Sequence, residues 1–373
     1  MRLSFVRFVG LAAAGLLALP GAHAQRPGAL PTMDAFRLTL DSLRRAHPTP
    51  GLAVAVVRRG EPVWAEGFGV ADADEDVPVT ADTPFWVASV TKTFVGLTFL
   101  LLDADGAVSL DDRMADVPGF DGFCGWLAGS PLPFGRGLDC ASPITVRTVL
   151  THTSNGDVGR AFLYNPLMFS RLSRYLEWKA NDSTEIEGGM NELARQVEAR
   201  ILAPAGMTRS VASQWDRSKM GVVYDMARGY GIEEGQYVQR PQPKRALTGG
   251  AGVVSTVRDL ARYAEALDAG TLAPPAVMDA LTTPPLDRNG HALPYAYGWY
   301  VQTYRGERLV WHSGWDADAG TSSLLLRVPS RGLAFVVLAN GEGVHWDTPL
   351  DAAEIEGSPY ARAFLDRFVF GGQ

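Results

Sequence analysis

The spacing of hydrophobic positions changes along the chain, and the change predicts strands near both ends. Residues 34–46 carry apolar side chains at helical spacing. They are followed by a β-branched run at 52–57, a polar turn at 58–61 and a second short apolar stretch at 63–65. Two such runs joined by a short turn are typical of a β-hairpin. The N-terminal part therefore predicts one helix and then a pair of antiparallel strands.

The middle of the chain has mostly helical spacing. An almost uninterrupted apolar run covers 91–103, and Gly106 follows where a helix would end. Further helices are predicted at 145–150, at 166–202 with a polar interruption at 181–184, and at 256–267. Glycine, proline and polar side chains predict irregular structure at 112–145 and 213–247.

Short apolar runs return near the C-terminus. They lie at 308–311, 322–328 and 333–338, and an amphipathic segment at 358–370 follows them. This pattern predicts an antiparallel meander and a closing helix. The N-terminal hairpin needs partner strands, and the meander is the obvious candidate.

The expected fold is therefore α/β plus all-α. An antiparallel sheet is built from N- and C-terminal segments and flanked by helices, and a helical domain is inserted between those segments. We expect the α/β part at about 34–80 and 250–373, and the helical part at about 81–249. A chain of 373 residues is long enough for one large domain or two interleaved ones.

Composition narrows the class of protein. The chain is 46% hydrophobic and 20% charged, which is ordinary for a globular protein. Its formal net charge is −7 and its isoelectric point is about 5.4. An acidic chain without a lysine or arginine block argues against nucleic acid as a partner. The expected partner is a small-molecule or peptide substrate, and the oligomeric state is left open.

Residues 1–24 have the pattern of a secretory signal peptide. Arg2 and Arg7 precede an apolar core at 9–19, and Ala22-His23-Ala24 is a small-x-small motif after which cleavage would leave Gln25 as the first residue. A membrane anchor is the alternative, but the apolar run is short for a bilayer span. We therefore expect residues 25–373 to be exported, to the periplasm or out of the cell, without an integral membrane segment.

The two cysteines support an oxidising compartment. Cys124 and Cys140 lie sixteen positions apart, with several glycines and prolines between them. In an exported chain such a pair predicts a disulfide. Two free thiols are the alternative, and a metal site is disfavoured because two cysteines and scattered histidines form no ligand cluster.

The stretch Ala88-Ser89-Val90-Thr91-Lys92 carries the strongest chemical signal. Ser89 and Lys92 are three residues apart at the start of an apolar helix, so their side chains would share one face. A serine hydroxyl needs a nearby base to become a nucleophile, and a desolvated lysine can supply one near neutral pH. An exposed helix turn is the alternative explanation. Lys92 is one of only four lysines, and no other has serine three residues before it.

Three further motifs follow in order along the chain, and each alone also fits an ordinary structural role. They are Leu150-Thr151-His152-Thr153-Ser154, the segment from Phe162 to Pro166 with Tyr164 at its centre, and Trp311-His312-Ser313-Gly314-Trp315. Together with Ser-x-x-Lys they resemble the serine β-lactamase and penicillin-binding-protein superfamily, and most closely its class C β-lactamase-like branch. The resemblance covers roughly residues 34–342.

The resemblance implies a role for each matching residue. Ser89 would be the acylated nucleophile, and Lys92 would hold its ammonium near Ser89 and Tyr164, favouring a tyrosinate. Tyr164 would then act as general base and later as acid. His312 stands where many relatives have lysine. Gly314 would let the strand approach the substrate, and the backbone N–H groups of Ser89 and Trp315 would form an oxyanion hole.

One departure from the family pattern affects the expected substrate. The family's Tyr-x-Asn motif has Pro166 at its third position, and Asn165 precedes it. Asn165 could bind substrate in its place if the loop is reshaped. We therefore expect an exported serine hydrolase acting on ester, amide or lactam carbonyls without metal or organic cofactor, with esters favoured. The alternatives are a D-amino-acid peptidase or penicillin-binding protein, and a non-catalytic binding module of the same fold.

Overall fold

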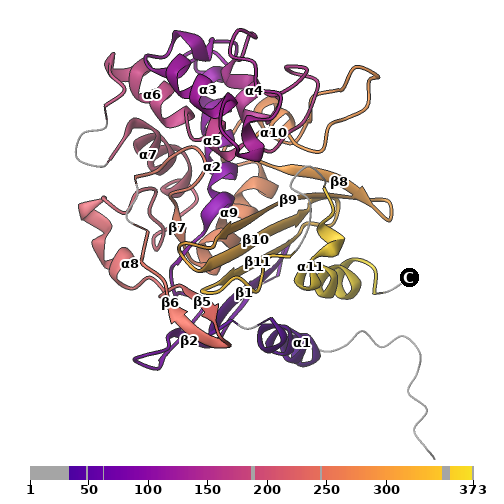
Figure 1. Ribbon diagram of the computed structural model, residues 1–373. Helices are drawn as coiled ribbons and strands as arrows, with labels where there is room; N and C mark the ends of the chain where they lie inside the picture. The colour runs from indigo at the N-terminus through magenta and orange to yellow at the C-terminus, as the bar shows by residue number, and fades with distance from the viewer. Residues whose placement is uncertain are drawn as a thin grey trace, which may run out of the picture.

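The computed structural model describes residues 33–47, 49–61, 63–185, 190–243, 246–346 and 353–371. Its centre is a seven-stranded antiparallel sheet in the order β3-β2-β1-β11-β10-β9-β8 (Figure 1). The strands are β1 (Gly51–Arg58), β2 (Trp64–Asp72), β3 (Val77–Pro78), β8 (Tyr300–Tyr304), β9 (Glu307–Asp316), β10 (Thr321–Val328) and β11 (Leu333–Ala339). The predicted sheet of N- and C-terminal segments is confirmed.

Alternating residues explain why the sheet is buried on both faces. Along β1, Ala53 and Ala55 belong to one apolar cluster and Leu52 and Val54 to the other. Because successive side chains of a strand point to opposite faces, one strand serves two cores. The first face packs against α2 (Thr91–Ala104) and α9 (Val257–Ala269), and the second against α1 (Met33–Ala46) and α11 (Pro359–Phe364), which a π-helix (Leu365–Val369) extends.

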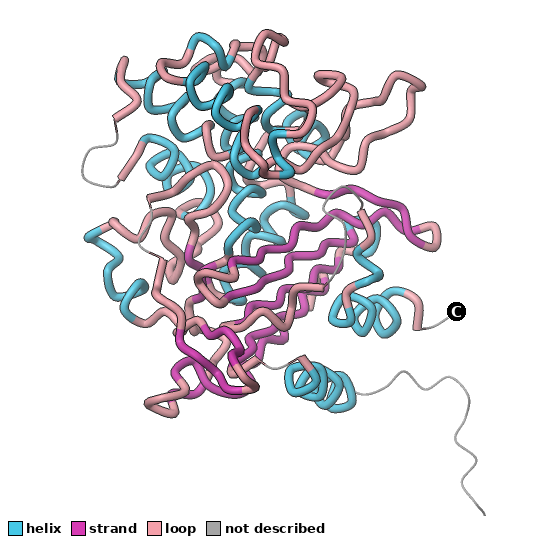
Figure 2. Tube along the Cα trace, viewed as in Figure 1, coloured by secondary structure: helices cyan, strands magenta, loops and turns pink. Residues whose placement is uncertain are grey.

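The remaining helices are α3 (Phe120–Ala128), α4 (Val146–Leu150), α5 (Pro166–Phe169), α6 (Leu172–Asn181), α7 (Glu192–Val197), α8 (Met220–Tyr224) and α10 (Pro275–Leu281). Most of them gather beyond one side of the sheet, whereas α8 lies apart, near β5 (Tyr230–Glu233) and β6 (Gln236–Gln239) (Figure 1 and Figure 2). The apolar helix α2 runs from this layer toward the sheet. Its residues 91–102 are all buried, so it is a shared core element. The exact division into two domains stays a prediction.

Three segments differ from the sequence-based expectation. Helix α3 lies inside the supposedly irregular 112–145, because Phe120, Cys124 and Leu127 are buried at helical spacing despite the intervening glycines. The segment 213–247 contains α8 and a hairpin of β5 (Tyr230–Glu233) and β6 (Gln236–Gln239). The predicted helix 166–202 is broken into α5, α6, α7 and a π-helix (Glu198–Leu202).

The two cysteines are joined by the predicted disulfide, which ties α3 to the loop that precedes α4. In the part of the chain that the structure describes, no helix is long and apolar enough to cross a membrane. The signal peptide predicted at 1–24 lies outside the described residues.

Candidate active site

The candidate nucleophile lies on a tight turn between the short strand β4 (Phe85–Trp86) and helix α2. Ser89 is the middle residue of a 3₁₀ turn (Ala88–Val90), and α2 begins at Thr91. Ala88 has φ 45°, a left-handed conformation that costs energy for a residue with a Cβ atom. The turn follows β4, which pairs with β7 (Val254–Ser255). These contacts hold Ser89 half-buried at the N-terminus of helix α2.

Lys92 lies directly beneath Ser89 and is fully buried. Its Nζ donates to Ser89 Oγ at 2.9 Å and to the Gly250 carbonyl oxygen at 2.9 Å. The Nζ atom also lies 5.1 Å from the centre of the Tyr164 ring. No carboxylate among the described residues pairs with it, and burial lowers the pKa of Lys92 to about 7. An amine of this kind is partly neutral at physiological pH.

Tyr164, on the loop before α5, extends toward Ser89 and Lys92. Its ring lies 4.4 Å from that of His152 and stacks on Tyr300 at 6.1 Å between centroids. Burial raises the pKa of the Tyr164 hydroxyl, and its hydrogen bond with Ser89 opposes this only in part. Tyr164 is therefore protonated and Lys92 is easily deprotonated. Both directions oppose the tyrosinate that the sequence-based interpretation expected.

His312, on β9, is buried and uses both ring nitrogens inside the protein. Its Nδ1 lies 2.5 Å from the Ser313 carbonyl oxygen and its Nε2 lies 2.9 Å from the Tyr295 hydroxyl. A carbonyl only accepts, so we assign the proton to Nδ1, and Tyr295 then donates to Nε2. Burial, aided by the nearby Lys92, lowers the pKa of His312 to about 3. His312 is thus a neutral residue where many relatives carry a cation.

Gly314 allows β9 to pack against the turn that carries the nucleophile. A methyl group in place of its hydrogen would lie 2.4 Å from the Val87 carbonyl oxygen and 3.0 Å from the Ser89 nitrogen. The close approach expected of this glycine is therefore found toward Ser89. It brings the backbone of β9 next to the Ser89 amide, and the oxyanion hole of Ser89 and Trp315 stays a prediction.

Asn165 has a structural role in addition to the expected substrate contact. Its side-chain oxygen accepts from the Met168 N–H and caps α5, while its amide donates to the Phe134 carbonyl at 2.9 Å and to Asn155 Oδ1 at 3.0 Å. All these partners belong to the protein and the side chain is buried. Asn165 therefore orders the loop that presents Tyr164, and its contact with substrate stays a prediction.

These residues enclose a cleft of about 200 Å³ with a largely aromatic wall. Its lining residues are Ser89, Phe134, Tyr164, Pro166, Tyr300, His312, Ser313, Trp315 and His345. The exposed Trp315 stacks on His345 with 4.4 Å between ring centroids. Sequence reasoning missed Phe134, Tyr300, His345 and Tyr295. Phe134 reaches the wall from the loop that the disulfide closes, which no local sequence signal indicates.

No three histidine, cysteine or acidic side chains of the described residues gather in a way that could hold a metal ion. The chemistry visible in the cleft is that of a hydroxyl, a deprotonatable amine, a phenol and backbone amides. Such a set can transfer a proton and form a covalent bond to a carbonyl carbon.

Comparison with known proteins assigns the chain to one family. The model of the family described as "Beta-lactamase" matches residues 36–357. The D-aminopeptidase of Gluconobacter oxydans is 27% identical over 330 residues, which cover 82% of this chain and 59% of that protein. The Unguisins hydrolase ungD' of Aspergillus campestris is 26% identical over 350 residues, covering 82% of this chain and 61% of that protein. The chain thus spans about three fifths of the length of these relatives.

A solved structure shows the same fold over nearly the whole chain. The class C β-lactamase from Rhodobacter sphaeroides superposes with a TM-score of 0.64 at 20% identity, covering 90% of this chain and 99% of that one. The mixed architecture described above is therefore that of the β-lactamases and penicillin-binding proteins.

Proposed function

The chain belongs to the β-lactamase family, and on that premise we propose that it is a serine hydrolase that works through an acyl-enzyme. One observation carries the proposal. A fully buried lysine, for which the described residues provide no carboxylate partner, lies 2.9 Å from a serine hydroxyl at the wall of a cleft. Burying an amine without a charged partner lowers the stability of the fold, and groups buried at such a cost are concentrated at functional sites.

In the proposed mechanism, the Ser89 proton passes to Lys92 and Tyr164 protonates the leaving group. The neutral Lys92 amine accepts the Ser89 proton as Oγ attacks the substrate carbonyl, giving a tetrahedral oxyanion. The backbone N–H groups of Ser89 and Trp315 would stabilise that charge. The neutral Tyr164 hydroxyl then donates its proton to the leaving alkoxide and regains one from the Lys92 ammonium. Water, activated by Lys92, hydrolyses the acyl-enzyme and restores Ser89.

Charge and size of the cleft favour small neutral esters. Among the described residues that line it there is no arginine or lysine, and His312 is neutral because its pKa is lowered to about 3. Penicillins and cephalosporins carry a carboxylate that would meet no cation there. The volume of about 200 Å³ is also below that of sites for drug-sized molecules. An ester with a short apolar acyl group needs only Ser89, a base and the oxyanion hole.

We therefore expect nitrophenyl acetate or butyrate to be hydrolysed with a kcat/KM at least about tenfold above that for penicillins and cephalosporins. A polar group left unpaired on a bound ligand costs about 1–3 kcal/mol, which corresponds to this factor or more. Steady-state assays of both classes on the same preparation measure the ratio. Cephalosporin turnover faster than ester turnover would contradict the charge argument.

The pH dependence of kcat/KM should follow the deprotonation of the Lys92 amine. Lys92 is active as a base only when deprotonated, so kcat/KM for a neutral ester should rise with pH and level off above a midpoint near 7. His312 and Tyr164 do not titrate in this range, because the pKa of His312 is lowered to about 3 and that of Tyr164 is raised. Initial rates between pH 5.5 and 9 measure the profile. A rate that is flat across pH 7 would remove Lys92 from the role of base.

A second substrate class has support from the D-aminopeptidase relatives. The D-aminopeptidase of Gluconobacter oxydans shares 27% identity with this chain, so peptides of D-amino acids are the other candidate. A screen of short D-peptides beside the esters separates the two. A non-catalytic binding module is disfavoured by the buried Lys92, and a fluorophosphonate probe that labels Ser89 would exclude it.

We further propose that the mature chain begins at residue 25 and works in the periplasm or outside the cell. The disulfide between Cys124 and Cys140 supports this location, because such bonds persist in oxidising compartments. N-terminal sequencing of protein recovered from the periplasm or medium tests the cleavage site.

A further inference from the structure

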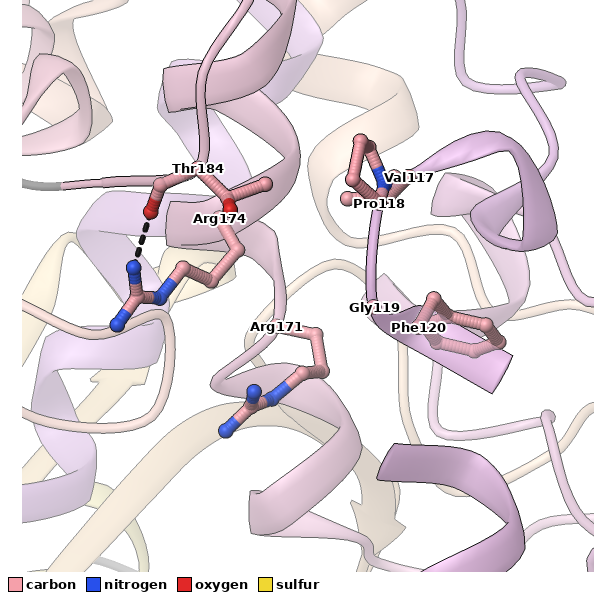
Figure 3. A pocket seen from close by; sticks show the side chains of 7 residues that line it. All are labelled: Val117, Pro118, Gly119, Phe120, Arg171, Arg174 and Thr184. Atoms are coloured by element: carbon pink, nitrogen blue, oxygen red, sulfur yellow. Dashed lines mark hydrogen bonds between the residues drawn. The ribbon is translucent and has the colours of Figure 1, made fainter. Parts of the chain in front are cut away.

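A second pocket lies in the helical layer, away from the residues of the cleft. It has a volume of about 200 Å³ and is bounded by the segment 117–120, by Arg171 and Arg174, and by Thr184. Figure 3 shows the two arginines on one side and the 117–120 segment on the other. None of these residues lines the Ser89 cleft.

No acidic side chain in the described part of the chain neutralises the two arginines. Among the described residues, neither Arg171 nor Arg174 forms an ion pair, whereas seventeen other arginines of the described chain do. The Nε atom of Arg171 is buried and has no hydrogen-bond partner among the residues that the structure describes. A buried N–H donor without an acceptor is costly, so an acceptor from outside would relieve it.

The surrounding backbone adds to the positive potential. Arg171 is the N-cap of α6 and Arg174 lies in its first turn, where the helix dipole already favours an anion. Gly119, the N-cap of α3, lines the same pocket, and no side chain caps that helix. The N-cap residues of two helices and both arginines thus line one small pocket. Asp121, in the first turn of α3, does not line the pocket and forms no ion pair with either arginine.

Each arginine is held by a contact that leaves donors available. The Arg171 guanidinium lies 3.9 Å from the centre of the Phe123 ring, and Arg174 donates to the Thr184 carbonyl oxygen. Burial, and to a smaller extent the nearby positive charge of Arg174, lowers the pKa of Arg171. The arrangement is therefore preorganised for a negatively charged ligand with several acceptor oxygens.

We infer that this pocket binds a small oxyanion, such as phosphate or the carboxylate end of a small metabolite, at a site separate from the Ser89 cleft. Guanidinium groups suit both ligands because they present parallel N–H donors to paired oxygens. The volume admits a small ion and excludes a drug-sized molecule.

Calorimetric titration of the whole protein tests the inference, with inorganic phosphate and with succinate at constant ionic strength set by sodium chloride. Saturable binding of at least one anion with a midpoint of about 1 mM or below is expected. The relative strength of the two tells which oxyanion the site prefers. Because the measurement is of binding, its result does not depend on the proposed hydrolase activity.

Variants show whether the binding belongs to this pocket. Arg174→Gln should weaken it about tenfold or more, because one charged donor is lost. Arg171→Lys keeps the charge and should weaken it less than Arg171→Gln. Arg217→Gln is the matched control, because Arg217 is exposed and outside the pocket. Circular dichroism verifies the fold, and Arg174→Gln remains informative if replacing Arg171, which packs on Phe123, unfolds the chain.

Two results would overturn the inference. One is wild-type protein that binds neither anion saturably. The other is binding that Arg174→Gln and the double Arg171→Gln, Arg174→Gln variant leave unchanged.

Discussion

Replacing Ser89 by alanine is expected to reduce ester turnover by at least about a thousandfold, because it removes the oxygen that would form the acyl-enzyme. The residual rate would come from the oxyanion hole and substrate binding. The fold should persist, since Ser89 is half-buried and its change leaves Lys92 bonded to the Gly250 carbonyl. Turnover and thermal melting of the same samples measure both effects.

Labelling provides the control for this variant. A fluorophosphonate probe should modify the wild-type protein and the exposed-residue variant Ser109→Ala to the same extent, and Ser89→Ala not at all. Undiminished labelling or turnover in Ser89→Ala would assign the nucleophile elsewhere.

Lys92→Met should also abolish turnover, and it should change how stability depends on pH. The pKa of Lys92 falls from 10.5 to about 7 on burial. Between these values the unfolded chain holds a proton that the folded chain lacks, so the free energy of unfolding rises with pH. From pH 7 to 9 this contribution is about 2 kcal/mol in the wild type, and methionine removes it.

Urea titrations at several pH values measure that slope. Between pH 7 and 9, His152 and His312 do not titrate in the folded protein, because their pKa values are lowered. The buried Tyr164 and Tyr295 do not titrate there either, because their pKa values are raised. The comparison uses the slope, because methionine also leaves the Gly250 carbonyl without its lysine donor. Equal slopes in both proteins would mean that Lys92 is not neutral in the folded state at pH 9.

Much of the fold follows from local patterns. The hairpin, the apolar helix α2, the C-terminal meander and the closing helix were predictable, because each has a regular spacing over several turns or strand residues. Helix α3 was not, because Gly122 and Gly125 interrupt its pattern and its burial depends on distant partners. Strand β8 was missed because it lies at the sheet edge and is only partly buried.

The residues of the candidate site could be predicted only where they lie close together in the sequence, in a short motif. Ser89 and Lys92 are three residues apart, and helix geometry brings them together. By contrast, the Gly250 carbonyl that accepts from Lys92 is 158 positions away, and the loop carrying Phe134 reaches the cleft through packing. Asn165 was noticed as a possible substrate contact, but its role as the cap of helix α5 was not foreseen from the sequence.

The strand order also constrains when a newly made chain can become active. Strand β1 pairs with β11, and Leu52 lies opposite Ala339, so the centre of the sheet closes only when both ends are present. Contacts so distant in sequence form slowly. A chain halted before residue 333 would leave β1 with one open edge, and open edges pair with other chains. Unfinished copies would therefore be inactive and prone to aggregate, so synthesis must reach its last strand before the nucleophile turn has a stable support.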